Sequence, residues 1–171
     1  MEYKNPMQQP RIEKAVVNIC IGEGGERLGK AEKLLQTLTG RKPVRTISVS
    51  RIPTWGLKKG EPIGCKVTLR GPKADEVIKR LLAAREKRLP ASSFDENGNV
   101  SFGLSEYIDV DGLKYDPDIG IMGLNCTVTI ERPGFRVKHR KIRAKQIHEK
   151  YRVSSQESIE YFKNNFGVEI E

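Results

Sequence analysis

Cysteine is scarce in this sequence of 171 residues, and its three copies form no recognisable motif. Cys20, Cys65 and Cys126 are widely spaced, their number is odd, and no C-x-x-C pair occurs. This pattern argues against a disulfide framework or a zinc ribbon and is typical of a protein from a reducing, cytosolic compartment. Because each cysteine lies in an apolar run, we expect all three to be small buried core residues.

Long apolar runs are also missing. No stretch approaches 18 consecutive apolar residues, and the beginning of the sequence has no run of signal-peptide length, so we expect neither a membrane span nor a leader. Hydrophobic residues make up 37% of the chain and charged residues 31%, which suits a folded protein with a heavily charged surface. We expect one domain over residues 1–171, with a basic C-terminal extension from about 132 to 171.

Catalytic and metal-binding motifs are sparse. The only two histidines, His139 and His148, lie in a cationic segment that would repel a metal ion, and no Ser-His-Asp or Cys-His arrangement occurs. A partial calcium-loop match at 95–106 has Val100 where glycine is required, and Asn97-Gly98 instead favours a hairpin. The sequence therefore predicts a protein that is not an enzyme, with no metal site and no cofactor.

One stretch imitates a nucleotide-binding motif. Residues 24–31, "GGERLGKA", place a glycine, four residues and then Gly29-Lys30, as in a phosphate-binding loop. Ala31 stands where that loop needs the hydroxyl that holds Mg²⁺, and Glu23 and Glu26 would repel phosphates. We interpret the glycines as a tight strand-to-helix turn, and a nucleotide-dependent enzyme is the weaker alternative.

Hydrophobic periodicity predicts an α+β fold. Residues 11–21, 63–70 and 122–130 alternate apolar and polar side chains, as half-buried strands do. Apolar stripes at helical spacing predict a first helix that ends at Thr39-Gly40 and a second from Pro72 whose buried stripe runs to Leu89. A last helix follows the Ser-x-x-Glu capping box that begins at Ser154. We expect a mostly antiparallel sheet with helices packed on one face and an open polar face.

The polar halves of the strands are candidates for binding. Their residues are short amide and hydroxyl side chains beside cations: Asn18 from the first strand, Lys66, Thr68 and Arg70 from the second, and Asn125 and Thr127 from the third. Such groups suit close approach to a phosphate backbone. Contact with water explains the same alternation equally well, so the pattern alone leaves both interpretations open.

Acidic residues are the minority, which gives a net charge of +9 and a pI of about 9.5. This balance predicts a polyanionic partner, either nucleic acid or a membrane surface. The excess cations lie in 41–59, 70–88 and 136–152, and aromatic residues that could stack on bases lie in or beside these segments: Trp55, Phe135 and Tyr151. The last segment has too little apolar stripe for a membrane-bound helix, so we expect nucleic acid and no membrane. No helix-turn-helix, zinc finger or other sequence-reading motif occurs, which favours shape recognition of folded RNA.

Several longer stretches together resemble one known family. "RIEKAVVNICIGEGGERLGKAEKLLQTLTGRKPV", "GEPIGCKVTLRG", "FDENGNVSFGLSEYI" and "YDPDIGIMGLNCTV" are similar, in this order, to the large-subunit ribosomal protein L-five (L5) family. "RPGFRVKHRKIRAKQI" and the helix after it resemble the archaeal and eukaryotic branch. The resemblance covers nearly the whole chain and is therefore far more specific than any short motif.

The resemblance implies a structural constituent of the large ribosomal subunit in the cytoplasm. Members of the family bind 5S rRNA and attach it to large-subunit rRNA in the central protuberance. They help form an intersubunit bridge to a small-subunit head protein of the S-thirteen (S13) family, and they reach toward the peptidyl-site tRNA during translation. A free-standing RNA chaperone is the alternative within the RNA-binding class.

The resemblance also assigns contact residues. It implies 5S rRNA contacts at Asn18, Thr68 and Arg41, where Arg41 replaces the usual Gln and so favours a phosphate contact. The loop from Ser50 to Pro62 corresponds to the tRNA-facing loop, with Arg51, Trp55, Lys58 and Lys59 as its contacts. With the neighbouring polar and basic residues, the rRNA-binding set is Asn18, Arg41, Lys42, Lys66, Thr68, Arg70, Asn125 and Thr127. The basic C-terminal segment adds Arg136, Lys138, Arg140, Lys141, Arg143 and Lys145.

Overall fold

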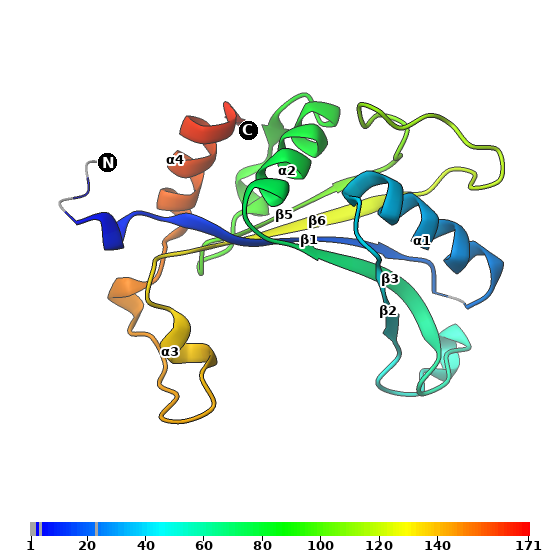
Figure 1. The fold of residues 1–171 in the computed structure, drawn as a ribbon, viewed down its shortest axis with the longest axis horizontal. Coiled ribbons are helices and arrows are strands. Elements are labelled where there is room, and N and C mark those ends of the chain that lie inside the picture. Colours follow the sequence, from blue (N-terminus) through cyan, green and yellow to red (C-terminus); the bar gives the residue numbers. More distant parts are fainter. Residues whose placement is uncertain (1–2, 4, 23) are drawn as a thin grey trace.

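The computed structural model describes residues 3, 5–22 and 24–171. Its centre is a five-stranded antiparallel sheet in the order β2-β3-β1-β6-β5, and the long helices cover one face of it (Figure 1). The sheet strands are β1 (Arg11–Cys20), β2 (Val44–Ile47), β3 (Pro62–Leu69), β5 (Asn99–Leu104) and β6 (Leu124–Glu131). The helices are α1 (Glu26–Thr39), α2 (Pro72–Ala84), α3 (Arg136–His139) and α4 (Ser155–Phe166). Short 3-10 turns are η1 (Pro6–Gln8), η2 (Pro53–Trp55), η3 (Ala91–Ser93) and η4 (Glu149–Tyr151).

The core lies between the sheet and the helices. The apolar half of β1 is fully buried, and the matching halves of β3 and β6 are buried beside it. From the other side, α1 and α2 bury the stripes that their spacing predicts, and Phe162 of α4 is completely buried against Phe94 and Phe166. The predicted α+β class, with helices on one face of an antiparallel sheet, is therefore confirmed. The antiparallel pairing of β1 with β3 also differs from the parallel sheet that a phosphate-binding loop requires.

Two predicted helix ends are confirmed, the C-terminal end of α1 and the N-terminal end of α4. Gly40 adopts a left-handed conformation after α1 and donates its backbone N–H to the carbonyl of Gln36. Ser154 and Glu157 form the reciprocal capping box before α4. Glu23, which we expect to repel phosphates ahead of α1, lies outside the described residues.

Two predictions from the sequence are wrong: the length of α2 and the burial of Cys20. Leu89 is buried, but it does not continue α2, because Glu86 and Lys87 adopt left-handed conformations and turn the chain after Ala84. It lies instead in β4 (Arg88–Leu89), which pairs in parallel with β7 (Glu169–Ile170). Cys20 is exposed rather than buried, because the strand period puts it on the open face, whereas Cys65 and Cys126 are core residues as expected.

The hairpin predicted at Asn97-Gly98 is present as a tight turn. The backbone N–H of Asp95 donates to the carbonyl of Asn99, and Gly98 takes a positive φ of 81°. On the far side of the turn, β5 runs along β6, which begins at Leu124. In the described part of the chain, no helix has the length and apolarity needed to cross a bilayer.

Candidate nucleic-acid interface

The face of the sheet turned away from the helices carries the predicted polar residues in ordered rows. The strand register sets Asn18 directly between Lys66 and Asn125. The next row sets Val16 between Thr68 and Thr127. Residues from three strands, distant in sequence, therefore form one continuous surface, which we call the open face.

The polar side chains of the open face reach solvent. Lys66, Thr68 and Asn125 are exposed, and Asn18 and Thr127 are half-buried. The hydroxyl of Ser101 on β5 donates to the hydroxyl of Thr127 at 3.1 Å, which ties β5 to β6 within the same row. The surface thus offers amide, hydroxyl and ammonium groups at short reach, as contact with a phosphate backbone needs.

Arg70 differs from the other predicted contacts because it forms an ion pair. Its guanidinium donates to the carboxylate and to the backbone carbonyl of Glu13 on β1. Partial burial would raise the pKa of Glu13, but the hydrogen bond from Arg70 and the charge of Lys14 outweigh it and lower this pKa. The positive charge of Arg70 is therefore partly neutralised within the chain.

The predicted Arg41 and Lys42 lie in the turn from α1 to β2, beside the edge of the sheet, and both are exposed. The next cation, Arg45, points to the helix side and forms a two-point ion pair with Glu32 of α1, at 2.5 and 3.2 Å. The hydrogen bond from Arg45 lowers the pKa of Glu32. The sequence analysis did not single out this pair, whose partners lie 13 residues apart and meet only through the packing of α1 on the sheet.

The loop between β2 and β3 is an ordered hairpin that extends the sheet. Ile52 and Leu57 exchange backbone hydrogen bonds of 3.0 and 3.1 Å around η2, and Leu57 is buried. The backbone N–H of Lys58 donates to the carboxylate of Glu61 at 3.0 Å. The four side chains predicted to face tRNA all point into solvent, with Trp55 72% exposed: Arg51, Trp55, Lys58 and Lys59.

Residues 132–152, which we call the basic arm, form a second projection. Within it, the backbone N–H of Lys145 donates to the carbonyl of Val137 at 3.3 Å, and the guanidinium of Arg140 donates to the carbonyl of Arg143 at 2.8 Å. These bonds fold the arm back on itself. All six predicted cations are exposed on it: Arg136, Lys138, Arg140, Lys141, Arg143 and Lys145.

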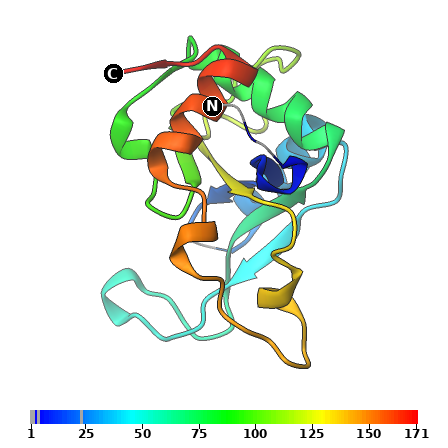
Figure 2. The same ribbon diagram turned by 90° about the vertical axis from the view of Figure 1, so that its left-hand side faces the viewer.

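The two projections leave the sheet at opposite ends and on the same side. Figure 1 shows the loop of 48–61 and the basic arm extending away from the layer of helices, with the open face between them. The end-on view in Figure 2 shows both below the sheet and the helices above it. The open face and the two cationic projections at its ends together form one surface, which we call the saddle.

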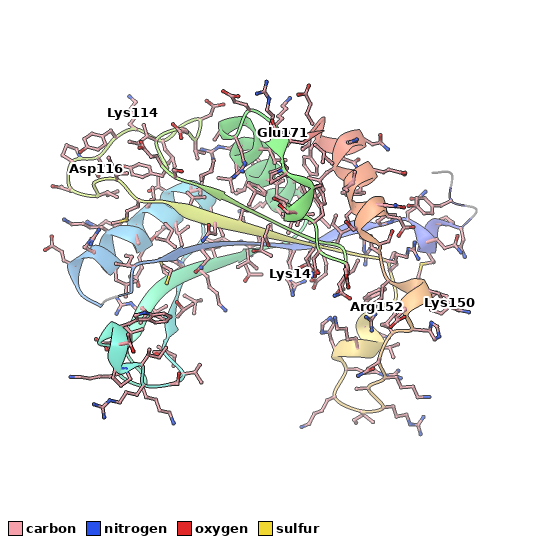
Figure 3. The ribbon with its side chains drawn as sticks, turned by 180° about the vertical axis from the view of Figure 1, so that it is seen from behind. Lys14, Lys114, Asp116, Lys150, Arg152 and Glu171 are labelled. Atoms are coloured by element: carbon pink, nitrogen blue, oxygen red, sulfur yellow. The ribbon has the colours of Figure 1, made fainter. Side chains whose placement is uncertain are left out.

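The acidic residues collect elsewhere. The segment 105–121 carries five acidic side chains and lies at the opposite end and side from Arg152, as the labels of Asp116 and Lys114 show in Figure 3. The phenol of Tyr107 accepts the backbone N–H of Asp116 at 3.0 Å, and Arg80 of α2 donates to the carbonyl of Asp111. The acidic segment is thus held in place, apart from the saddle.

Other polar side chains near the saddle were not singled out from the sequence. Lys14 and Thr129 face each other across β1 and β6, and Arg152 lies beside them with Asn97 and Asn99. Period-two counting places Lys14 and Thr129 on the polar strand faces, although neither is among the predicted contacts. Nothing local in the sequence brings Arg152 to the sheet. The two histidines of this region are exposed, and the described residues contain no group of three or more potential metal ligands.

Comparison with known proteins identifies the family of this chain. The sequence profile of the C-terminus of the ribosomal L5 family matches residues 62–161, and that of ribosomal protein L5 matches residues 5–58. The large ribosomal subunit protein uL5 of Methanosphaera stadtmanae is 54% identical over 98% of this chain and 99% of its own. The protein of the same name from Sulfurisphaera tokodaii is 53% identical over 97% of this chain and 94% of its own. That from Methanococcoides burtonii is 46% identical over 98% of this chain and 99% of its own. With both profiles matched and these relatives aligned almost end to end, the chain belongs to the ribosomal protein L5 family.

Proposed function

We propose that this chain binds 5S rRNA across its open face and attaches it in the central protuberance of the large ribosomal subunit. Membership of the L5 family makes the chain a structural constituent of that subunit, in the cytoplasm, and not an enzyme. The finer assignment of the RNA and of its contacts is our proposal.

One observation carries the proposal: a polar sheet face without helices lies between two cationic projections (Figure 3). Amide and hydroxyl groups on a sheet can approach the sugar-phosphate backbone and the 2′-hydroxyls closely, and cations at both ends neutralise phosphates farther along the RNA. The open face offers no aromatic ring in its two central rows, so base stacking does not supply the affinity there. These features support recognition of a folded RNA by its shape.

The test of this proposal is a comparison of 5S rRNA binding at one fixed salt concentration. Thr68→Ala removes a hydroxyl from the open face and should weaken binding about three- to tenfold, the size of one lost hydrogen bond. Lys66→Gln should also lower the dependence of log K on log salt by about 0.7–0.9. Lys33→Gln, at an exposed position of α1 on the opposite face, is the matched control. It also removes one positive charge, but it should leave both the affinity for 5S rRNA and its salt dependence nearly unchanged. If wild-type protein binds an unrelated folded RNA of equal length as tightly as 5S rRNA, the proposal is wrong.

We further propose that the loop of 50–62 contacts peptidyl-site tRNA. Its cations and Trp55 are exposed, and the loop as a whole projects away from the sheet (Figure 1). The double substitution of Lys58 and Lys59 by Gln should therefore weaken tRNA contact on assembled subunits and leave 5S rRNA binding within about twofold. An equal loss of tRNA contact and of 5S rRNA binding would contradict the assignment of these two contacts to separate surfaces.

A bridge to the S13 protein of the small-subunit head is proposed on the family resemblance. The acidic segment 105–121 is the surface best suited to a basic protein, because it lies apart from the cationic saddle and exposes Tyr115 and Ile121 beside its carboxylates. Asp118→Lys should weaken capture of the purified S13 protein and leave 5S rRNA binding unchanged. Capture that survives this charge reversal would locate the bridge elsewhere.

A further inference from the structure

The basic arm and the open face enclose a cleft that neither the sequence nor the family comparison assigns. Its volume is about 440 Å³. The sheet supplies a third row of the open face, because Lys14 lies opposite Thr129, and Thr129 lies opposite Asn99. The arm supplies the facing wall with Phe135, Lys138 and Gln146.

The lining of the cleft is cationic. Lys14, Lys138 and Arg152 line it together with one carboxylate, that of Glu131. Lys14 also lies 3.4 Å from the carboxylate of Glu13 on the same strand. The sum of these charges still favours an anion over a cation or a neutral apolar ligand.

Arg152 is held at the rim by its own hydrogen bonds. Its guanidinium donates to the carbonyl of Ile147 at 3.3 Å and to the side-chain oxygen of Asn97 at 3.2 Å. Figure 3 shows Arg152 at the root of the arm and Lys14 on the same side of the sheet. These contacts preorganise one cation and connect the arm to the turn before β5 (Asn99–Leu104).

The dimensions and side chains fit one nucleotide. A cleft of this volume lies in the range of small-ligand sites, about 300–1,000 Å³, and is too small for an RNA duplex. The half-buried ring of Phe135 offers a stacking surface, and Thr129, Asn99 and Gln146 offer hydroxyl and amide groups for the edge of a base. The cations that line the cleft can neutralise the phosphates that flank such a nucleotide.

We propose that this cleft binds a single unpaired nucleotide extruded from the RNA that occupies the saddle. The base stacks on Phe135 between the arm and the sheet, and its flanking phosphates contact Lys14 and Lys138. This inference rests on the proposed RNA-binding function. It adds that the arm acts as a clamp, which sets the register of the RNA on the open face by the position of one bulged base.

The experiment uses the full chain and two RNA hairpins that differ only in one unpaired 2-aminopurine. The bulged hairpin should bind about tenfold more tightly than the fully paired one, the size of one base stacked on an aromatic ring, and the 2-aminopurine fluorescence should fall on binding. Phe135→Leu keeps an apolar side chain but removes the ring, and it should remove most of this preference. Thr129→Val, nearly isosteric in a strand, should reduce it severalfold. Lys163→Gln on α4 is the matched control and should leave it intact.

The outcomes separate this inference from the proposed function. Equal binding of the two hairpins, or a preference that survives both Phe135→Leu and Thr129→Val, overturns the clamp even where 5S rRNA still binds. A preference that persists in Thr68→Ala, whose 5S rRNA binding is weakened, supports the clamp as a separate site. AMP should displace the bulged hairpin only at millimolar concentration, because a free nucleotide lacks the flanking phosphodiester; displacement at micromolar concentration would overturn RNA as the ligand.

Discussion

The ion pair between Arg132 and Glu157 joins the root of the basic arm to α4, and Glu157→Gln should destabilise the fold. The guanidinium of Arg132 lies 2.5 Å from one carboxylate oxygen of Glu157, and the two side chains are only 15% and 13% exposed. The other oxygen accepts the backbone N–H of Ser154 at 3.2 Å and completes the capping box. Arg132 Nε is buried without a hydrogen-bond partner among the described residues, so the pair with Glu157 is the main compensation for this buried charge.

The magnitude follows from the burial of the pair. Removing one partner of a fully buried ion pair costs about 3–5 kcal/mol, and breaking an exposed pair costs about 0.2–1 kcal/mol. Because both side chains are mostly buried and glutamine can still accept the bond from Ser154, we expect Glu157→Gln to lower the free energy of unfolding by about 2 kcal/mol. Glu157→Ala also removes half of the capping box and should cost roughly 1 kcal/mol more.

The assay is urea unfolding followed by far-UV circular dichroism, with a coincident near-UV signal from buried aromatic residues such as Tyr107 as the two-state check. With a slope of about 2 kcal/mol per molar urea, the Glu157→Gln midpoint should fall by about 1 M. Gln156→Ala, at an exposed position of the same helical turn, is the control. The double variant with Arg132→Met should be more stable than Glu157→Gln alone, because no unpaired charge remains buried. A Glu157→Gln midpoint unchanged from wild type, or a double variant as unstable as the sum of its parts, would refute this reasoning.

Two other predictions concern reactivity and packing. Native protein at pH 8 should react with iodoacetamide at Cys20 alone, because Cys20 is exposed whereas burial raises the pKa of Cys65 to about 11 and that of Cys126 to about 12. A second adduct in the mass spectrum of the folded protein would contradict this prediction. Gly29→Ala should raise the free energy of unfolding by roughly 0.5–1 kcal/mol, because the added methyl group meets no neighbouring atom within 4 Å in α1. Gly64→Ala should lower it by about 1–3 kcal/mol, because its methyl group would lie 2.7 Å from a carbonyl oxygen of β1. Thermal shifts of the same sign for the two glycine variants would show that this steric account is wrong.

Local sequence patterns predicted most of the fold because they act over a few residues. A period of two places Asn18, Thr68 and Asn125 on the polar faces of their strands. The same period contradicts our expectation that Cys20 is buried, which relied only on the apolar run around it. The helix stripe was extended too far to Leu89, because periodicity cannot detect the left-handed turn that ends α2.

The sequence by itself determined the elements, their caps, the polar strand faces and the excess of positive charge. Only the tertiary structure decided which strands are neighbours, and so set Asn18 between Lys66 and Asn125. It also decided that the loop of 48–61 and the basic arm extend to the same side, and that Arg152 meets Asn97 at a cleft. The physical reason is that strand register and long-range charge pairs depend on how the helices and sheet bury their apolar faces together, and no single segment carries that information.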